Sequence, residues 1–416
     1  MATVSYSARP DGFFPLLAES ARHSVSGLEA DSGDVLRVLR KPRLDERDFA
    51  VLLSPAAGRE LERMARRAQD ETLRHFGRAK QLFAPLYLGN YCTNKCVYCG
   101  FHAGTAIARK ALSESEIEAE AQALAATGLR RVLALTGDAP KRTGADYIAR
   151  GVNILARYFP SVGIEVQALT LDEYARVAQA GADSMTMFQE TYDPELYARL
   201  HLAGPKRDFS FRLDAPHRAV EAGMRGITLG ALLGLGDWRF DIFMLAMHGQ
   251  WLQRRFPHVE LAFSLPRIRP CADDESGGEP GGAGVENASL FDPLPVDDRC
   301  FVQALTALRC FMPHAGITLS TRECAFLRDR LLPLGVTKLS AGVCTSVGGY
   351  VRHEDTEAVQ FVIDDQRSVE EMVRDLEKQG FQPVFADWLL PEKGDLPLAG
   401  ALRRSLGGLE NAAAGI

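Results

Sequence analysis

The chain has 416 residues, of which 46% are hydrophobic and 25% are charged, a composition ordinary for a globular enzyme. Its formal net charge is −6, and because it has no basic stripe and no block of like charge we expect no nucleic-acid partner. No apolar run is long enough to span a bilayer and the N-terminus lacks a secretory pattern, so we expect a cytoplasmic protein without a membrane partner.

The first part of the chain, residues 1–80, is expected to form a helical N-terminal extension. Segments 21–40, 45–57 and 58–77 carry apolar residues at helical spacing, with polar residues between them. The pattern changes at about residue 82, so we place a boundary there.

Beyond this boundary, short β-branched runs alternate with amphipathic segments eight times. Strands that alternate with helices favour a parallel sheet with right-handed crossovers. Eight such units predict an α/β fold, a closed (β/α)8 barrel of the TIM type over residues 81–350, with an incomplete barrel as the alternative. The runs occupy residues 82–90, 131–138, 163–169, 184–192, 226–234, 259–267, 316–323 and 338–343.

Three of the segments between the strands have clear helical signatures. Residues 113–127 open with a Ser and Glu capping pattern, residues 170–180 end at a glycine, and residues 237–256 form a long segment that is apolar on one face. These segments supply the helices that a parallel barrel needs on its outside.

Two further segments lie late in the chain. Residues 271–293 are Gly-rich and acidic, and predict a loop at the mouth of the barrel, either a solvated insertion or a lid. Residues 351–416 are expected to form a short C-terminal extension packed on the barrel, with a helix at 368–380, a short apolar stretch at 381–390 and a tail.

Polar residues gather where the predicted strands end. In a TIM-type barrel, active sites lie at the carboxyl ends of the strands, so these residues are candidates for a site. The alternative is that polarity simply rises where any strand ends. The residues are Asp138, Glu165, Gln167, Gln189, Glu190, Thr191, Arg267, Ser320, Arg322, Glu323 and Ser340.

Three of the eight cysteines cluster in the loop after the first strand, at Cys92, Cys96 and Cys99. Thiolates at this spacing bind a soft metal or an iron–sulfur cluster. A structural zinc site takes four ligands, and His102 offers a fourth. A cluster held by only three cysteines leaves one iron open to a small molecule, which suits catalysis.

The Cys-x3-Cys-x2-Cys pattern, with Tyr98 directly before its last cysteine, is similar to the signature of the radical S-adenosylmethionine superfamily. This resemblance implies a 4Fe–4S cluster held by Cys92, Cys96 and Cys99, with S-adenosylmethionine at the fourth iron. A non-catalytic iron–sulfur or zinc protein remains the alternative from a different class.

Nine segments, spread in order over roughly residues 35–390, narrow the resemblance. They resemble the 2-iminoacetate synthase family, the radical tyrosine lyases of thiamine biosynthesis, and close cousins act in hydrogenase maturation or on tryptophan. No cysteine motif follows Cys344, which speaks against the hydrogenase-maturation cousin with its second cluster. The segments are 52–57, 84–101, 135–138, 165–167, 188–192, 229–239, 266–271, 319–323 and 348–350.

The resemblance implies a set of contacts to S-adenosylmethionine. They comprise an aromatic ring near the adenine, groups for the methionine amine and carboxylate, groups for the ribose, and a glycine that lets the backbone approach the adenine. The family usually has Glu where this chain has Asp138, which shortens the reach to the amine. In the order of the chain the implied residues are Tyr98, Asp138, Glu165, Gln189, Arg212 and Gly230.

On the substrate side, the resemblance implies that Arg322 pairs bidentately with the amino-acid carboxylate. The alternative for Arg322 is an ordinary ion pair with Glu323 or Asp329. Three further residues are expected to hold the carboxylate or amine or to line the pocket, namely Ser320, Ser340 and Tyr91.

The reaction implied is cleavage of the Cα–Cβ bond of L-tyrosine, which gives 2-iminoacetate and p-cresol. Because 2-iminoacetate hydrolyses readily, the resemblance also implies handover to a thiazole synthase partner, and a reductant such as flavodoxin or ferredoxin. The alternative within the same enzyme class is a lyase that acts on tryptophan.

Overall fold

The structure is a computed structural model that describes residues 11–24, 29–268, 294–352 and 363–385. The loop predicted at 271–293 and the tail after residue 385 lie outside the described residues. Within the described ranges, no helix is both long and apolar enough to cross a membrane.

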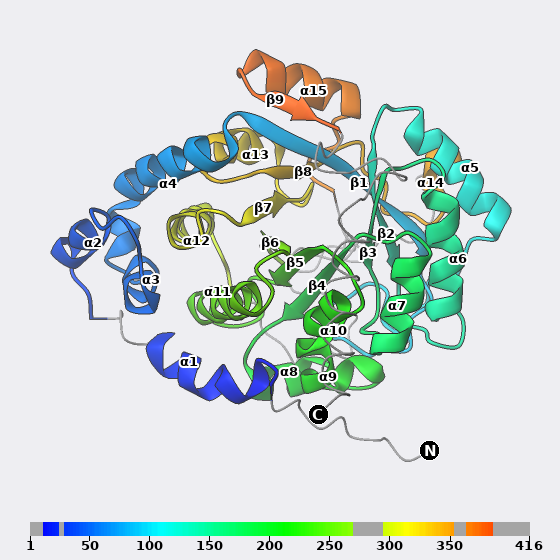
Figure 1. The fold of residues 1–416 in the computed structure, drawn as a ribbon, viewed down its shortest axis with the longest axis horizontal. Helices are drawn as coiled ribbons and strands as arrows, with labels where there is room; N and C mark the ends of the chain where they lie inside the picture. The colour runs from blue at the N-terminus through cyan, green and yellow to red at the C-terminus, as the bar shows by residue number, and fades with distance from the viewer. Residues whose placement is uncertain (1–10, 25–28, 269–293, 353–362, 386–416) are drawn as a thin grey trace, which may run out of the picture. The chain divides into compact units, whose positions relative to one another are not determined.

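Eight parallel strands close into a barrel (Figure 1), which confirms the predicted fold class. The strands follow one another around the barrel in chain order, and β1 closes it by pairing with both β8 and β2. Each predicted run overlaps a strand, and β1 and β3 begin two or three residues before their runs. Their bounds are β1 Ala79–Gly89, β2 Arg131–Thr136, β3 Ser161–Glu165, β4 Ser184–Glu190, β5 Gly226–Ala231, β6 Glu260–Ser264, β7 Gly316–Leu319 and β8 Lys338–Ser340.

Helices surround the strands in Figure 1, as the alternating pattern predicts. The three predicted segments form α5, α7 and α11, and α5 and α7 each begin with a capping box. The helices between and after the strands are α5 Glu114–Ala125, α6 Ala145–Leu155, α7 Leu171–Gln179, α8 Pro194–Leu200, α9 Phe209–Leu213, α10 Ala215–Glu221, α11 Trp238–Arg255, α12 Asp298–Phe311, α13 Ala325–Leu331 and α14 Gly349–Arg352.

The N-terminal extension consists of α1 Leu17–Ser24, α2 Ser32–Val38, α3 Glu46–Leu52 and α4 Leu61–Phe76. It packs on the outside of the barrel, with α4 and α3 against α12 and α1 against α11. Phe49 stacks on Phe243 and Phe311, with ring centroids 5.7 and 4.5 Å away. Gln303 of α12 donates hydrogen bonds to the carbonyls of Leu52 and Ser54, at 3.0 and 2.8 Å. These contacts tie the segment at 52–57 to the barrel helices.

A ninth strand, β9 Gln382–Val384, follows helix α15 Val369–Lys378 and pairs in parallel with the start of β1. The sequence predicts the helix, but describes the residues after it only as a short apolar stretch. A three-residue strand is too short to show a period of two, and only its pairing with residues 79–81 defines it.

The inner face of the barrel combines the branched apolar side chains that usually fill such barrels with many small residues. Side chains of this size leave open space between the strands. The small residues include Ser161, Gly163, Ser184, Thr186, Thr228, Ser264 and Thr318.

Candidate active site

The loop that carries the three cysteines is held by backbone hydrogen bonds to the segment after α8. The amide of Lys95 donates to the carbonyl of Ala203 at 3.0 Å, and the amide of Leu202 donates back to Lys95 at 2.9 Å. The amide of Val97 donates to Leu200 at 3.1 Å. The cysteine loop therefore pairs in antiparallel fashion with residues 200–203, which lie about a hundred residues later in the chain.

Asn94, between the first two cysteines, links the cysteine loop to Asp138 and to Lys206 by side-chain hydrogen bonds. Its amide nitrogen donates to the Asp138 carboxylate at 2.7 Å, and its oxygen accepts from the amide of Lys206 at 3.0 Å. Gly204 has a φ of 90°, and a Cβ there would lie 2.2 Å from the Asn94 oxygen. The sequence analysis missed Asn94, and it assigned Asp138 to the methionine amine. In the structure, the Asp138 carboxylate binds the cysteine loop.

All three cysteines belong to this loop, with Cys96 buried and Cys92 and Cys99 half-buried. Burial raises the pKa of each thiol, and the ammonium of Lys206 opposes this effect at Cys96 and Cys99.

Across the described part of the chain, no three His, Cys, Asp or Glu side chains gather tightly enough around one point to hold a single metal ion. A zinc site on the three cysteines and His102 would need such a group. A four-iron cluster does not need three side chains around one point, because each cysteine binds a different iron atom.

A cavity of about 230 Å³ lies inside the barrel, below the cysteine loop. Its wall includes Cys99 and Tyr98 at the carboxyl ends of the strands, and it reaches Arg131 and Lys338 near their amino ends. Five other candidates from the sequence also line it, namely Glu165, Glu190, Ser320, Arg322 and Ser340.

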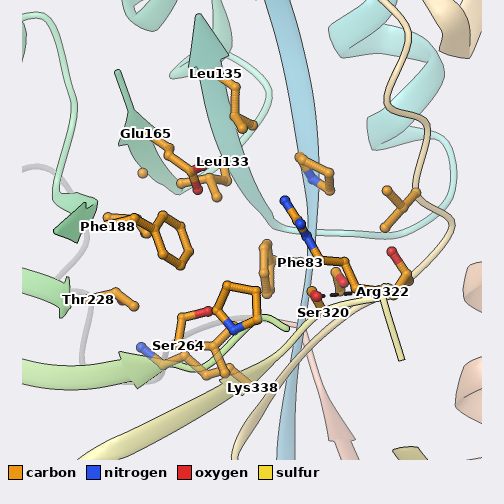
Figure 2. Close-up of a pocket in the computed structure, with 18 of the residues that line it drawn as sticks. Phe83, Leu133, Leu135, Glu165, Phe188, Thr228, Ser264, Ser320, Arg322 and Lys338 are labelled. Atoms are coloured by element: carbon orange, nitrogen blue, oxygen red, sulfur yellow. Dashed lines mark hydrogen bonds between the residues drawn. The ribbon is translucent and has the colours of Figure 1, made fainter. Parts of the chain in front are cut away.

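Arg322, in the loop after β7, and Glu165, the last residue of β3, reach into the cavity from two separate parts of the barrel wall (Figure 2). The hydroxyl of Ser320 accepts a hydrogen bond from the backbone amide of Arg322 at 3.3 Å. Burial raises the pKa of Glu165 to about 7, although the nearby Arg322 guanidinium lowers it. The cavity thus contains a guanidinium and a carboxyl that exchanges its proton near neutral pH.

The alternative partners for Arg322 are bound by other arginines. Glu323 pairs with Arg267, whose Nε lies 3.0 Å from one carboxylate oxygen. Asp329 pairs with Arg367, at 2.9 Å. The side chain of Arg322 itself points at the cavity.

Five of the residues predicted to contact the cofactor or the substrate do not line this cavity, namely Tyr91, Asp138, Gln189, Arg212 and Gly230. The ring of Tyr91, expected in the pocket, instead lies 4.8 Å from the Arg142 guanidinium. Asp138 binds Asn94, and Arg212 donates from Nε to the carbonyl of Phe188 at 2.8 Å. Gln189 is buried, and both polar atoms of its amide lack a protein partner. An amide in this state fits a bound ligand or water.

In this structure Gly230 lies against the ring of Phe188. A Cβ at this position would lie 2.2 Å from the ring of Phe188 on β4, and that ring lines the cavity. The glycine therefore makes room for Phe188 in this structure, and its approach to an adenine stays a prediction.

Two further residues lie in the cavity wall: Glu190, a strand-end candidate without an assigned role, and Lys206, which the sequence did not single out. Glu190, at the end of β4, accepts a hydrogen bond from the ammonium of Lys206 at 2.6 Å. Lys206 also lies 5.6 Å from the centre of the Tyr98 ring. The sequence marks Glu190 as a site candidate, since it lies at the end of a predicted strand. Lys206 has no such mark, because it follows a helix rather than a strand.

Two family models match the chain, the Radical SAM superfamily over residues 86–244 and the Biotin and Thiamin Synthesis associated domain over residues 264–382. The chain is 41% identical over 372 residues to the 2-iminoacetate synthase of Escherichia coli (strain K12), and the match covers 89% of this chain and 94% of the relative. The chain belongs to the 2-iminoacetate synthase family. The Salmonella typhimurium (strain LT2) 2-iminoacetate synthase is 39% identical, with coverage of 89% and 94%.

Membership of this family makes the chain a radical S-adenosylmethionine enzyme, as the cysteine pattern predicts. Among solved structures it is similar to the FeFe-hydrogenase maturase HydG from Carboxydothermus hydrogenoformans. The TM-score is 0.79 at 29% identity, over 90% of this chain and 85% of the other. HydG also carries the barrel, so the fold is shared across this wider group.

Proposed function

We propose that this protein cleaves the Cα–Cβ bond of L-tyrosine to give 2-iminoacetate and p-cresol, for thiazole formation in thiamine biosynthesis. Membership of the 2-iminoacetate synthase family supports this activity. The observation that carries it is the cavity that has the third cysteine, Cys99, and the Arg322 guanidinium in one wall. A guanidinium is the natural partner for the carboxylate of an amino acid.

The cofactor site comprises Cys92, Cys96 and Cys99 for a 4Fe–4S cluster, with S-adenosylmethionine beside it. When bound, these groups supply a 5′-deoxyadenosyl radical, which removes a hydrogen atom from the substrate amine. The orphaned amide of Gln189 is consistent with a contact to this cofactor, because buried polar atoms are normally hydrogen-bonded. The half-buried Tyr98 ring in the cavity wall fits a contact with the adenine.

Three other predicted residues, Glu165, Arg212 and Asp138, are each given a role at the cofactor site. Glu165, which titrates near neutral pH, binds the ribose or the amine of the cofactor from within the cavity. Arg212 binds the methionine carboxylate from behind Phe188, where it already holds the strand end. Asp138 acts through Asn94 on the shape of the cysteine loop.

The substrate site comprises Arg322, Ser320 and Ser340. Arg322 binds the tyrosine carboxylate, and the hydroxyl of Ser340 is buried without a protein partner, so it can bond the carboxylate or the amine. A cavity inside a closed barrel keeps water and stray hydrogen donors away from the radical fragments. Positioning of the amine against the reacting carbon is then the main contribution of the protein.

The product and the electrons imply two partners. Since 2-iminoacetate hydrolyses readily, a thiazole synthase would receive it directly, and a flavodoxin or ferredoxin would reduce the cluster. We place the reaction in the cytoplasm, where such reductants are found.

The test is an anaerobic assay. The protein is reconstituted with iron and sulfide, then given S-adenosylmethionine, dithionite and either tyrosine or tryptophan, and products are identified by mass spectrometry. 5′-Deoxyadenosine with p-cresol from tyrosine is the expected result. Deoxyadenosine with an indole product from tryptophan alone would make it a tryptophan lyase. No deoxyadenosine from protein with an intact cluster would overturn the proposal.

Two cysteine variants provide matched controls. Cys99→Ala should lose both cluster iron and deoxyadenosine. Cys324→Ala changes an exposed cysteine outside the loop and should retain both. Equal iron content in the two variants would remove Cys99 from the ligand set.

A further inference from the structure

The end of β4 has an unusual backbone. Glu190 has a φ of 71°, and in the described part of the chain it is the only residue other than glycine with a positive φ. The amide of Thr191 donates to the carbonyl of Gln189 at 3.0 Å, so a three-residue turn is centred on Glu190. Turns of this kind with a positive central φ are rare and strained. Strain of this kind persists only where the surroundings hold it in place.

A buried carboxylate on α11 holds the turn. One oxygen of Asp241 accepts hydrogen bonds from the Thr191 hydroxyl at 2.9 Å and from the Tyr192 amide at 2.8 Å. Asp241 is 1% exposed, so both bonds lie away from water. On the other side, the amide of Leu232 donates to the carbonyl of Glu190 at 2.9 Å. The turn is therefore clamped between α11 and the end of β5.

The clamped turn presents a charged pair to the cavity. The Glu190 carboxylate lies 2.6 Å from the Lys206 ammonium, and both side chains line the cavity. The Arg212 guanidinium lies 4.0 Å from the same carboxylate oxygen. The pairing of β4 with β5 slips between Phe188 and Glu190, where the turn begins. A change in the turn would move Glu190 and release Lys206 from its place beside the Tyr98 ring.

We propose that Asp241 is a positioning residue of the reaction, because through the turn at Glu190 it keeps the Glu190–Lys206 pair in the cavity wall and so sets the cofactor against the substrate. Asp241 does not line the cavity, and it acts only through the turn. This inference rests on the proposed function where it predicts the ratio of products. Its prediction for cofactor-analogue binding does not depend on that function.

A purely structural role is the alternative. Asp241 lies near the N-terminus of α11, where a negative charge stabilises the helix dipole. That role predicts a lower melting temperature, with unchanged ligand affinity and product ratio for each correctly folded molecule. A positioning role predicts that affinity and product ratio change even in the folded fraction.

Three variants separate these roles. Asp241→Ala removes the acceptor, and Asp241→Asn keeps an oxygen that can accept both hydrogen bonds. The matched control is Asp237→Asn, which alters an exposed carboxylate that caps the same helix but does not touch the turn. Thr191→Val removes only the hydroxyl bond, and it decides the question if Asp241→Ala does not fold.

Each full-length variant is reconstituted and its iron is counted. Binding of S-adenosylhomocysteine is then measured by calorimetry, and the ratio of 5′-deoxyadenosine to p-cresol by mass spectrometry. For Asp241→Ala we expect roughly tenfold weaker binding and a ratio raised several-fold, at normal iron content. Thr191→Val should shift both in the same direction by a smaller factor. Asp241→Asn and Asp237→Asn should stay within about twofold of the natural protein.

Two results would overturn the inference. Wild-type binding and product ratio in folded Asp241→Ala, or in Thr191→Val if the former does not fold, would leave Asp241 a structural residue. An Asp241→Asn variant as impaired as Asp241→Ala would rule out the hydrogen-bond account. Failure of the proposed function has a different signature, since the natural protein itself would then release no p-cresol from tyrosine, while the binding series would still compare the variants.

Discussion

The Nε2 atom of His201 lies 2.8 Å from the hydroxyl oxygen of Tyr98. The other ring nitrogen, Nδ1, lies 2.7 Å from the carbonyl oxygen of Tyr197, so Nδ1 carries the proton and Nε2 accepts from the tyrosine hydroxyl. His201 is fully buried, whereas the Tyr98 ring forms part of the cavity wall. One hydrogen bond therefore fixes a cavity-lining ring to the segment after α8.

Tyr98→Phe should destabilise the protein by about 1–3 kcal/mol, because it leaves the buried Nε2 of His201 without a donor. Urea unfolding of the apoprotein measures this. The control is Tyr158→Phe, since the Tyr158 hydroxyl donates to Glu118 at the half-buried outer surface and its loss should cost less. Equal costs for the two variants would contradict the account of His201.

Arg322→Lys should raise the KM for tyrosine about 10- to 100-fold, because a bidentate charged hydrogen bond worth about 1.5–3 kcal/mol is lost. Binding of S-adenosylhomocysteine should change little, since the proposed contacts to the cofactor do not include this guanidinium. The control is Arg330→Lys on α13, whose side chain is exposed. Steady-state kinetics at saturating cofactor test this, and an unchanged KM with a lowered kcat would argue against carboxylate binding by Arg322.

Much of the barrel could be predicted from the sequence because its signals are local. Each strand is a short β-branched run, and the position of a polar residue at a strand end places it at one rim of the barrel. Glu165, Ser320, Arg322 and Ser340 line the cavity for this reason. The cysteine spacing is local as well, since all three lie within eight residues.

What escaped prediction depends on contacts between distant segments. Asn94 and His201 have their roles only because residues 200–206 fold back onto the cysteine loop. The ring of Phe188 lies against Gly230 because the two residues are partners on neighbouring strands. Neither relationship leaves a periodic trace in the sequence, so neither could be found without the fold.

The ion pair between Glu323 and Arg267 is predicted to contribute to stability rather than to catalysis. Both side chains are buried, at 2% and 10% exposure. Glu323→Ala should cost about 3 kcal/mol, near the low end for a broken buried pair, because Asp298 and the carbonyl of Val296 still bind Arg267 at 2.9 Å.

Urea unfolding checks this cost. The control is Glu62→Ala, which breaks the exposed pair with Arg66 and should have little effect. A Glu323→Ala variant as stable as this control would mean that Arg267 is solvated in place, and that the buried ion pair contributes nothing.

His248 should make the protein less stable as the pH falls below neutrality. Its ring is buried, stacks on Phe13 and bonds the Tyr192 hydroxyl through Nδ1 at 3.0 Å. Burial, followed by the neighbouring His217, lowers the pKa of His248 to about 3. Unfolded histidine titrates near 6.5, so between about pH 6.5 and 3 the unfolded chain binds a proton that the folded protein does not. Unfolding is therefore favoured progressively over that range.

Between pH 7 and 5.5 this single group should remove about 1 kcal/mol of stability. His248→Gln abolishes the titration, so its free energy of unfolding should fall by about that much less over the same interval than that of the natural protein. His258→Gln, at an exposed position, should retain the full dependence. Urea unfolding at the two pH values measures how much the free energy of unfolding of each protein changes. Comparing these changes cancels the effect of the carboxylates, which all three proteins share. Parallel losses in the natural protein and His248→Gln would show that the buried ring takes up a proton without unfolding.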